Sequence, residues 1–177
     1  MLHWLAEGRH VLVVGGGTVA LQKARAATDA GAIVTVVAPR ILDALQAHTR
    51  HMRPFEPADL DGMDLVFAAT DDPSVNRTVA ALCRARRLLV NVADDPEACD
   101  VTLPAVVRRG DLVLAVSTSG QSPGFAAWLR GDLEQRYGPE YGRALAVAAR
   151  LRQEARLSGE DPRTLPYAAL VAEQSVP

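Results

Sequence analysis

The stretch His10–Ala20, with the sequence HVLVVGGGTVA, decides the fold. Its four consecutive large apolar residues, Val11–Val14, predict a strand that is buried on both faces. Gly15 can adopt the backbone angles of a sharp strand-to-helix turn, and Gly17 lets the backbone approach a pyrophosphate closely. The stretch therefore has the spacing of a dinucleotide-binding turn, G-x-G-x-x-A, with Ala20 in place of a third glycine.

A helix over residues 19–30 and a strand over residues 33–37 are expected next, which completes one right-handed βαβ unit. A site of this kind often has an acidic residue after the second strand, but this chain has Pro39 and Arg40 there. Arg40 is compatible with three roles: binding a 2′-phosphate, stacking on the adenine, or lying in solvent. The sequence does not decide between NAD and NADP.

Further along, the pattern predicts a helix, an edge strand, a buried strand, a helix and a strand, over residues 41–50, 53–57, 64–69, 74–86 and 88–92 in turn. Ligands of doubly wound sheets bind at the carboxyl ends of the strands. Thr70 and Asp71 follow such a strand and are expected near the cofactor, although capping of the next helix also explains them. Asp94 follows the next strand, as a general base or as a turn former ahead of Pro96.

A change of pattern near Cys99 predicts a second structural unit. Strands over 101–107 and 112–116 are joined by a turn at Arg108–Asp111, and helices are expected over 124–137 and 141–157. The tail that follows is either a short last helix or frayed. We expect an α/β fold, with a Rossmann-like parallel sheet over residues 1–98, followed by a small α+β and helical region over residues 99–177.

Composition narrows the class of protein. A net charge of −2 and an aromatic content of 5% give no indication of a nucleic-acid partner or of an acidic membrane surface. The two cysteines, Cys83 and Cys99, form no C-x-x-C pair and suit reduced thiols. The four histidines show no metal-ligand spacing, so no metal site is expected. No apolar run could span a bilayer and residues 1–9 are too polar for a signal peptide, so a cytoplasmic protein is expected.

Several short stretches resemble one family when they are taken in order. They read VVGGGTVA with KAR, AATDD with VN, NVADDP, LPA and VSTSGQSP, at residues 13–20 with 23–25, 68–72 with 75–76, 91–96, 103–105 and 116–123. Together they resemble precorrin-2 dehydrogenase, which is also found as the N-terminal module of siroheme synthase. In some members the same chain is also the sirohydrochlorin ferrochelatase. The resemblance covers about residues 9–157.

The resemblance implies NAD-dependent oxidation of precorrin-2 to sirohydrochlorin in siroheme biosynthesis, followed in bifunctional members by insertion of ferrous iron. It places the key carboxylate of the family at Asp94. The cofactor contacts of the family lie just after the third glycine and after the second strand. The absence of an acidic residue after the second strand is therefore consistent with the family. Together with the glycine turn, the expected cofactor-binding residues are Gly15, Gly17, Thr18, Val19, Pro39, Arg40 and Thr70.

The implied substrate carries many carboxylates, so its site needs hydrogen-bond donors and positive charge. The loop 117–122 precedes a helix N-terminus, and we expect it to bind the substrate through Thr118, Ser119, Gly120 and Ser122. Arg108 and Arg109 either pair with substrate carboxylates or lie in a solvated turn. The resemblance also implies a homodimer, with the region after Cys99 crossing between subunits.

Two other functions compete with this one. A non-catalytic NAD-sensing module would have the same glycine turn, because a fold does not define an activity. The Asp94 segment and the loop 117–122 favour the enzyme, since a sensor needs neither. A chelatase without redox function is disfavoured by the intact glycine turn. The sequence does not decide whether chelatase activity is present.

Overall fold

The structure is a computed structural model that describes residues 3–175. The chain forms two compact units that divide between Thr102 and Leu103. The division into regions 1–98 and 99–177 that the sequence predicts stays a prediction. Within the described range, every helix is too short or too polar to cross a membrane.

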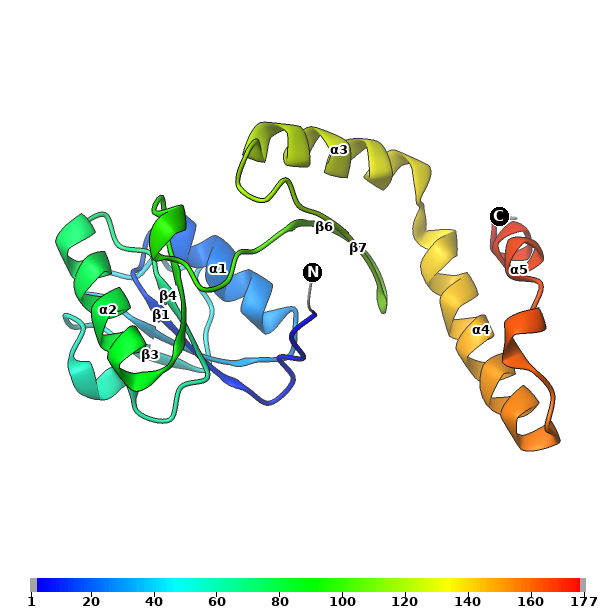
Figure 1. The fold of residues 1–177 in the computed structure, drawn as a ribbon, viewed down its shortest axis with the longest axis horizontal. Helices are drawn as coiled ribbons and strands as arrows, with labels where there is room; N and C mark the ends of the chain where they lie inside the picture. Colours follow the sequence, from blue (N-terminus) through cyan, green and yellow to red (C-terminus); the bar gives the residue numbers. More distant parts are fainter. Residues whose placement is uncertain (1–2, 176–177) are drawn as a thin grey trace. The chain divides into compact units, whose positions relative to one another are not determined.

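The first unit is built on a five-stranded parallel sheet (Figure 1). The strands lie in the order β3-β2-β1-β4-β5, and they are β1 (His10–Val14), β2 (Ile33–Val37), β3 (Thr49–His51), β4 (Leu65–Ala68) and β5 (Leu89–Val92). The strand order reverses between β1 and β4, and the crevice at such a reversal is where ligands of these sheets bind. The predicted Rossmann-like α/β class is confirmed.

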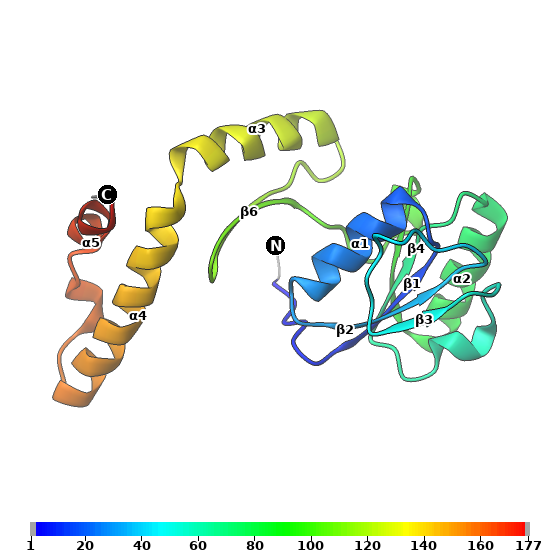
Figure 2. The same cartoon turned by 180° about the vertical axis from the view of Figure 1, so that it is seen from behind.

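Two helices cover opposite faces of this sheet, as Figures 1 and 2 show: α1 (Thr18–Thr28) and α2 (Pro73–Arg86). Val11 and Val13 pack in one apolar cluster with residues of α1, whereas Leu12 and Val14 pack in a second cluster with residues of α2. The side chains of β1 alternate between the two faces and all four are buried, as the apolar run predicted.

The helix predicted over 41–50 is wrong. The backbone N–H of His48 donates to the carbonyl of Val34 at 2.9 Å, where a helix would use the carbonyl of Ala44, and the N–H of Leu42 donates to the carbonyl of Gly16 at 2.9 Å. Leu45 is fully buried in the cluster on the α1 face of the sheet. The segment therefore folds as turns that tie the glycine loop to the core, and its last residues enter strand β3.

The edge strand predicted over 53–57 is also wrong. Arg53 instead donates to the Asp59 carboxylate, with 2.9 Å between Nη1 and Oδ2, and this contact holds the pKa of Asp59 below its usual range. The chain turns there into a short 3₁₀ helix, η1 (Pro57–Leu60). The edge strand beside β2 is β3, which the pattern missed because its three residues are all exposed.

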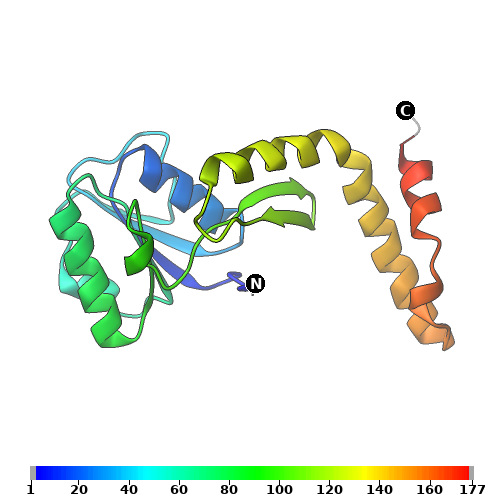
Figure 3. The ribbon, with the colours of Figure 1, turned by 45° about the horizontal axis from the view of Figure 1, so that its top comes forward.

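The second unit begins with a hairpin of β6 (Ala105–Arg109) and β7 (Leu112–Val116), which turns at Gly110 and Asp111. The first strand starts later than predicted, because the carbonyl of Val101 accepts a hydrogen bond from the side-chain amide of Asn91 and does not pair with a neighbouring strand of the hairpin. Three helices follow, α3 (Pro123–Arg136), α4 (Pro139–Ser158) and α5 (Tyr167–Gln174). Figure 3 shows α4 and α5 side by side, and the tail up to residue 175 is thus a short helix rather than frayed. Residues 176–177 of the tail lie outside the described residues.

Candidate functional site

The glycine turn after β1 leaves no room for side chains at its first two positions. Gly15 has a φ of +133°, and a Cβ there would collide with the carbonyl of Ala69. A Cβ on Gly16 would collide with the carbonyl of Arg40. The motif assigns no role to its second position, so the need for glycine at residue 16 was missed. It arises from the close packing of the segment after β2 against this loop.

Gly17 has open surroundings, because a Cβ built on it would meet no atom of the described residues within 4 Å. Gly17 is also the N-cap residue of α1, where no side chain accepts a hydrogen bond and no acidic residue occupies the first turn. The free N–H groups and the positive end of the helix dipole are therefore available to an anion. This arrangement fits a pyrophosphate.

A cavity of about 830 Å³ opens in front of this turn. We call it the dinucleotide cavity. Its volume lies within the range of about 300–1,000 Å³ that is typical of cofactor sites. The structure brings all of the predicted cofactor residues to its lining, together with Asp94 and several residues that were not predicted; the predicted ones are Gly15, Gly17, Thr18, Val19, Pro39, Arg40 and Thr70. The residues present therefore fit a dinucleotide.

The turn between β4 and α2 is fixed by Asn76, which is buried. Its Oδ1 accepts hydrogen bonds from the backbone N–H of Thr70 at 3.1 Å and from the Thr70 hydroxyl at 2.7 Å, and its Nδ2 donates to the Thr70 carbonyl at 3.0 Å. Capping of α2 falls to Asp72, whose carboxylate accepts from the Ser74 N–H at 2.8 Å. Thr70 and Asp71 are therefore not its N-cap, and both line the dinucleotide cavity.

Replacement of Asn76 by alanine is expected to lower the free energy of unfolding by about 2 kcal/mol, because the Thr70 N–H and carbonyl lose their buried partner. Loosening of Thr70 should also weaken NAD⁺ binding. Urea denaturation and calorimetric titration measure the two effects. Thr78→Ala, on the exposed side of the same helix, is the matched control and should change both quantities little. Equal effects of the two variants would contradict the role of Asn76.

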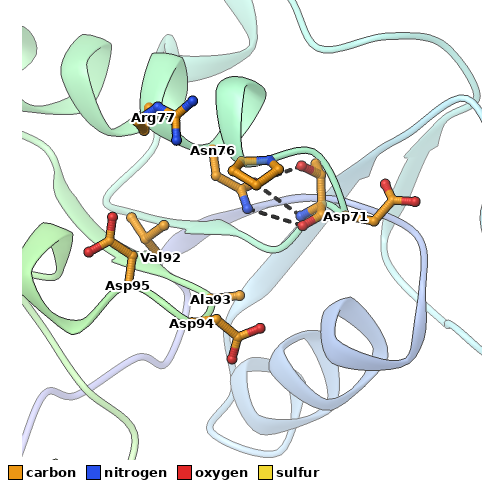
Figure 4. A pocket seen from close by; sticks show the side chains of 9 residues that line it. Asp71, Asn76, Arg77, Val92, Ala93, Asp94 and Asp95 are labelled. Atoms are coloured by element: carbon orange, nitrogen blue, oxygen red, sulfur yellow. Dashed lines mark hydrogen bonds between the residues drawn. The ribbon is translucent and has the colours of Figure 1, made fainter.

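Asp94 lies in the turn after β5 with a φ of 58°, a left-handed conformation that aspartate tolerates better than most residues. It lines the dinucleotide cavity and also a smaller cavity of about 290 Å³ beside it. Figure 4 shows its carboxylate pointing toward α1, whereas that of Asp95 points toward the side of Arg77. Asp95 instead caps the short 3₁₀ helix η2 (Pro96–Ala98) by accepting from Ala98.

The turn that carries Asp94 is held by the thiol of Cys99. The backbone N–H of Val92 donates to Sγ at 3.1 Å, and Sγ lies 3.3 Å from the carbonyl oxygens of both Val92 and Asp95. The sequence did not predict this role of Cys99, because nothing in the spacing indicates that its sulfur contacts the backbone of β5. Cys83, the other cysteine, is buried in α2, and this burial raises the pKa of its thiol to about 11.

The loop 117–122 belongs to the second unit and is organised by its own side chains. The hydroxyl of Ser122 caps α3 by accepting from Phe125, and the hydroxyl of Thr118 accepts from the N–H of Ser122 at 3.2 Å. Ser119 and Gly120 have left-handed φ values of 52° and 81°. The four predicted substrate residues thus form one tight turn ahead of a helix, and their role stays a prediction.

Of the two arginines in the β6–β7 hairpin, Arg109 makes side-chain hydrogen bonds to the end of α3. Arg109 donates from Nε to the carbonyl of Tyr137 at 2.8 Å and from Nη2 to that of Glu134 at 2.9 Å. Its guanidinium therefore joins the hairpin to the end of α3.

Among residues 3–175, no cluster of three or more histidine, cysteine, aspartate or glutamate side chains could hold a metal ion.

Two family models match the chain. Residues 2–105 match the family described as "Putative NAD(P)-binding", and residues 109–136 match the one described as "Sirohaem biosynthesis protein central". The first match confirms the NAD(P) cofactor that the glycine turn predicts.

Similar proteins of known name agree with these matches. The siroheme synthases of Pseudomonas entomophila (strain L48) and Azotobacter vinelandii (strain DJ / ATCC BAA-1303) are 45% identical over 162 residues and 42% identical over 156 residues. The alignments cover 88% and 85% of this chain, but the chain spans only about a third of these relatives, 35% and 34%. A solved structure, "SirC, precorrin-2 dehydrogenase", superposes with a TM-score of 0.74 at 26% identity, covering 99% of this chain and 89% of that one.

Proposed function

The chain belongs to the precorrin-2 dehydrogenase and siroheme synthase family of NAD(P)-binding proteins, and from this premise we propose that it oxidises precorrin-2 to sirohydrochlorin with NAD⁺ as the oxidant. The observation that carries the proposal is the position of Asp94. Its carboxylate lies at the rim shared by the dinucleotide cavity and the smaller cavity beside it. A carboxylate at that place could accept a proton from a substrate bound beside the cofactor.

The reaction removes a hydride and a proton from the macrocycle, and NAD⁺, when bound, supplies the hydride acceptor. The N–H groups at the start of α1 bind the pyrophosphate, and Gly17 lets it approach. Thr70, held by Asn76, lines the cavity beside this turn. Asp94 accepts the proton that leaves the macrocycle as the hydride departs, which balances the two-electron oxidation.

The carboxylates of the substrate are bound by the loop 117–122 in this proposal. The left-handed turn at Ser119 and Gly120 exposes backbone N–H groups, and the N-terminus of α3 adds its dipole. Arg108 suits a carboxylate better than Arg109 does, because the guanidinium of Arg109 is already engaged by the end of α3.

The protein acts as a homodimer through its second unit in this proposal. A two-stranded hairpin is marginal by itself, and the apolar cluster in this unit is small. On α3, the side chains of Phe125 and Trp128 are 55% and 63% exposed and pack against each other. A second copy covering such faces would stabilise the unit. The free thiols of Cys83 and Cys99 suit the reducing cytoplasm, where we place the enzyme.

An anaerobic assay with enzymatically generated precorrin-2 tests the proposal. Conversion to sirohydrochlorin, followed by the absorbance of the macrocycle, is expected only when both the protein and NAD⁺ are present. NAD⁺ binding without conversion would favour the sensing module instead. Adding ferrous ion afterwards tests for chelatase activity, which requires metal insertion faster than in an enzyme-free control.

A further inference from the structure

The outer edge of β5 is covered by residues 99–101, which we call the return segment. β5 is the last strand in the sheet order, so on that side its N–H and carbonyl groups have no neighbouring strand. The N–H of Val90 donates to the Asp100 carboxylate at 3.1 Å, and the Val90 carbonyl accepts from the Asp100 N–H at 2.8 Å. The side chain of Asn91 adds a further contact, since its Nδ2 donates to the Val101 carbonyl at 2.9 Å. The return segment therefore takes the place of a neighbouring strand.

At Val92, the last residue of β5, the partner on this edge is the sulfur of Cys99 rather than backbone. The Val92 N–H donates to Sγ at 3.1 Å, and Sγ lies 3.3 Å from the Val92 carbonyl oxygen. The Nδ2 of Asn91 approaches the same sulfur at 3.5 Å. A thiol both accepts weakly and carries one hydrogen that it can donate, so one atom serves the N–H and the carbonyl of the edge residue.

The same sulfur reaches across the turn that carries the proposed base. Sγ lies 3.3 Å from the carbonyl oxygen of Asp95, as well as contacting the backbone of Val92. Val92 precedes Ala93 and Asp94 in the chain, and Asp95 follows them, so the sulfur contacts both ends of this short turn. The N–H of Ala93 is fixed separately, since it donates to the carbonyl of Ala68 in β4 at 2.9 Å. Cys99 therefore holds the end of the turn that the sheet does not hold.

The backbone of Asp94 needs such support, because its conformation is unfavourable for a residue with a Cβ. Its φ of 58° lies in the left-handed region. A side chain is held in this region only when the surrounding structure determines it, and such positions are concentrated at functional sites. Figure 4 shows the result, in which the carboxylate of Asp94 points toward α1 and that of Asp95 points to the opposite side. If the turn relaxed, the carboxylate of Asp94 would leave the rim of the two cavities.

We propose that Cys99 is a positioning residue for the oxidation, because its sulfur closes the turn from Val92 to Asp95 and so keeps Asp94 in the left-handed conformation that places its carboxylate at the rim. The inference rests on the proposed function. Cys99 is not among the described residues that line either cavity. Its effect on the reaction therefore passes through the backbone of the turn.

A purely structural role is the alternative, and Cys83 distinguishes it. Both cysteines pack with the apolar cluster on the α2 face of the sheet, and Cys83 is the more deeply buried of the two. If Cys99 only filled space there, replacing either cysteine would lower stability and leave turnover by the folded protein unchanged. The positioning role requires a loss of turnover at Cys99 alone, and it requires hydrogen bonding rather than volume at that residue.

The test compares precorrin-2 oxidation by the full chain and by Cys99→Ala, Cys99→Ser and Cys83→Ala, at a temperature where all four are folded. We expect kcat of Cys99→Ala to fall about tenfold, since a misplacement of about 1 Å can cost up to about a hundredfold. Its KM for precorrin-2 and its Kd for NAD⁺ should stay within about twofold, because the binding groups are untouched. Cys99→Ser keeps a group that accepts and donates, so its kcat should return to within about threefold of the unaltered chain. Cys83→Ala should lower the free energy of unfolding but leave kcat in place.

A double variant checks that the effect passes through Asp94. In the Asp94→Ala background, Cys99→Ala should lower kcat no further, because the group that it positions is gone. With an active unaltered chain, an unchanged kcat in Cys99→Ala overturns this inference alone. The same holds if Cys99→Ser or Cys83→Ala loses as much turnover as Cys99→Ala does. An unaltered chain that does not oxidise precorrin-2 overturns the proposed function, and the inference falls with it.

Discussion

Replacement of Asp94 by alanine is expected to lower kcat for precorrin-2 oxidation by about a thousandfold, within the range of about 10²–10⁴ that a general base contributes. NAD⁺ affinity should stay the same, because the proposal places the pyrophosphate at the start of α1 and not at this turn. Asp94 is exposed and its side chain makes no hydrogen bond within residues 3–175, so the fold should not suffer. Steady-state kinetics and calorimetric titration measure both effects.

The neighbouring carboxylate gives a matched control for this prediction. Asp95→Asn keeps an oxygen that can accept from Ala98 and therefore keeps the cap of η2. Because the side chain of Asp95 points away from α1 in Figure 4, its kcat should change by less than about threefold, as for a residue outside the reaction. Asp94→Asn, which preserves size and removes the charge, should match Asp94→Ala. Oxidation by Asp94→Ala at the unaltered rate would exclude Asp94 as the base.

Replacement of Gly16 by alanine is expected to abolish measurable NAD⁺ binding and to lower the free energy of unfolding by about 3 kcal/mol, at the upper end of the cost of overpacking. The added Cβ would overlap the carbonyl of Arg40, which is backbone and cannot swing aside. The segment after β2 must then move, and the bond between the Leu42 N–H and the Gly16 carbonyl breaks with it. Urea denaturation and calorimetric titration measure the two losses.

Gly17→Ala is the matched variant one residue further along. Nothing in residues 3–175 lies within 4 Å of the added Cβ, so the free energy of unfolding should stay within about 0.5 kcal/mol of the unaltered value. NAD⁺ affinity should still fall, because the methyl group occupies space in front of the α1 N-terminus where the pyrophosphate approaches. Equal stability losses in Gly16→Ala and Gly17→Ala would contradict this account of the turn.

The first unit could be predicted from the sequence wherever one local pattern determines the outcome. The apolar run Val11–Val14 and the glycines after it have no other good conformation than a buried strand and a tight turn. The same holds for β4 and the start of α2, where Asp72 and Pro73 give a helix start. Once these strands are parallel and adjacent, their carboxyl ends place Thr70 and Asp94 at one edge.

The rest depended on contacts between distant parts of the chain. The apolar spacing of Ile41, Leu42 and Leu45 is typical of a helix. In the structure, however, the N–H of Leu42 donates to the carbonyl of Gly16, and the side chain of Leu45 packs in the core. Asn76 within a helix and Lys23 beside an alanine stripe resemble ordinary surface residues in the sequence. The contacts of Asn76 with Thr70 and of Lys23 with Phe67 become visible only when the fold brings these residues together.

A single-turnover experiment tests the central claim most directly. The protein, NAD⁺ and limiting precorrin-2 are mixed anaerobically, and NADH and sirohydrochlorin are followed together by their absorbance. The account predicts that one NADH forms for each sirohydrochlorin, at the same rate, and that Asp94→Ala slows both equally. Sirohydrochlorin that forms without NADH, or NAD⁺ that binds without any oxidation of precorrin-2, would contradict it.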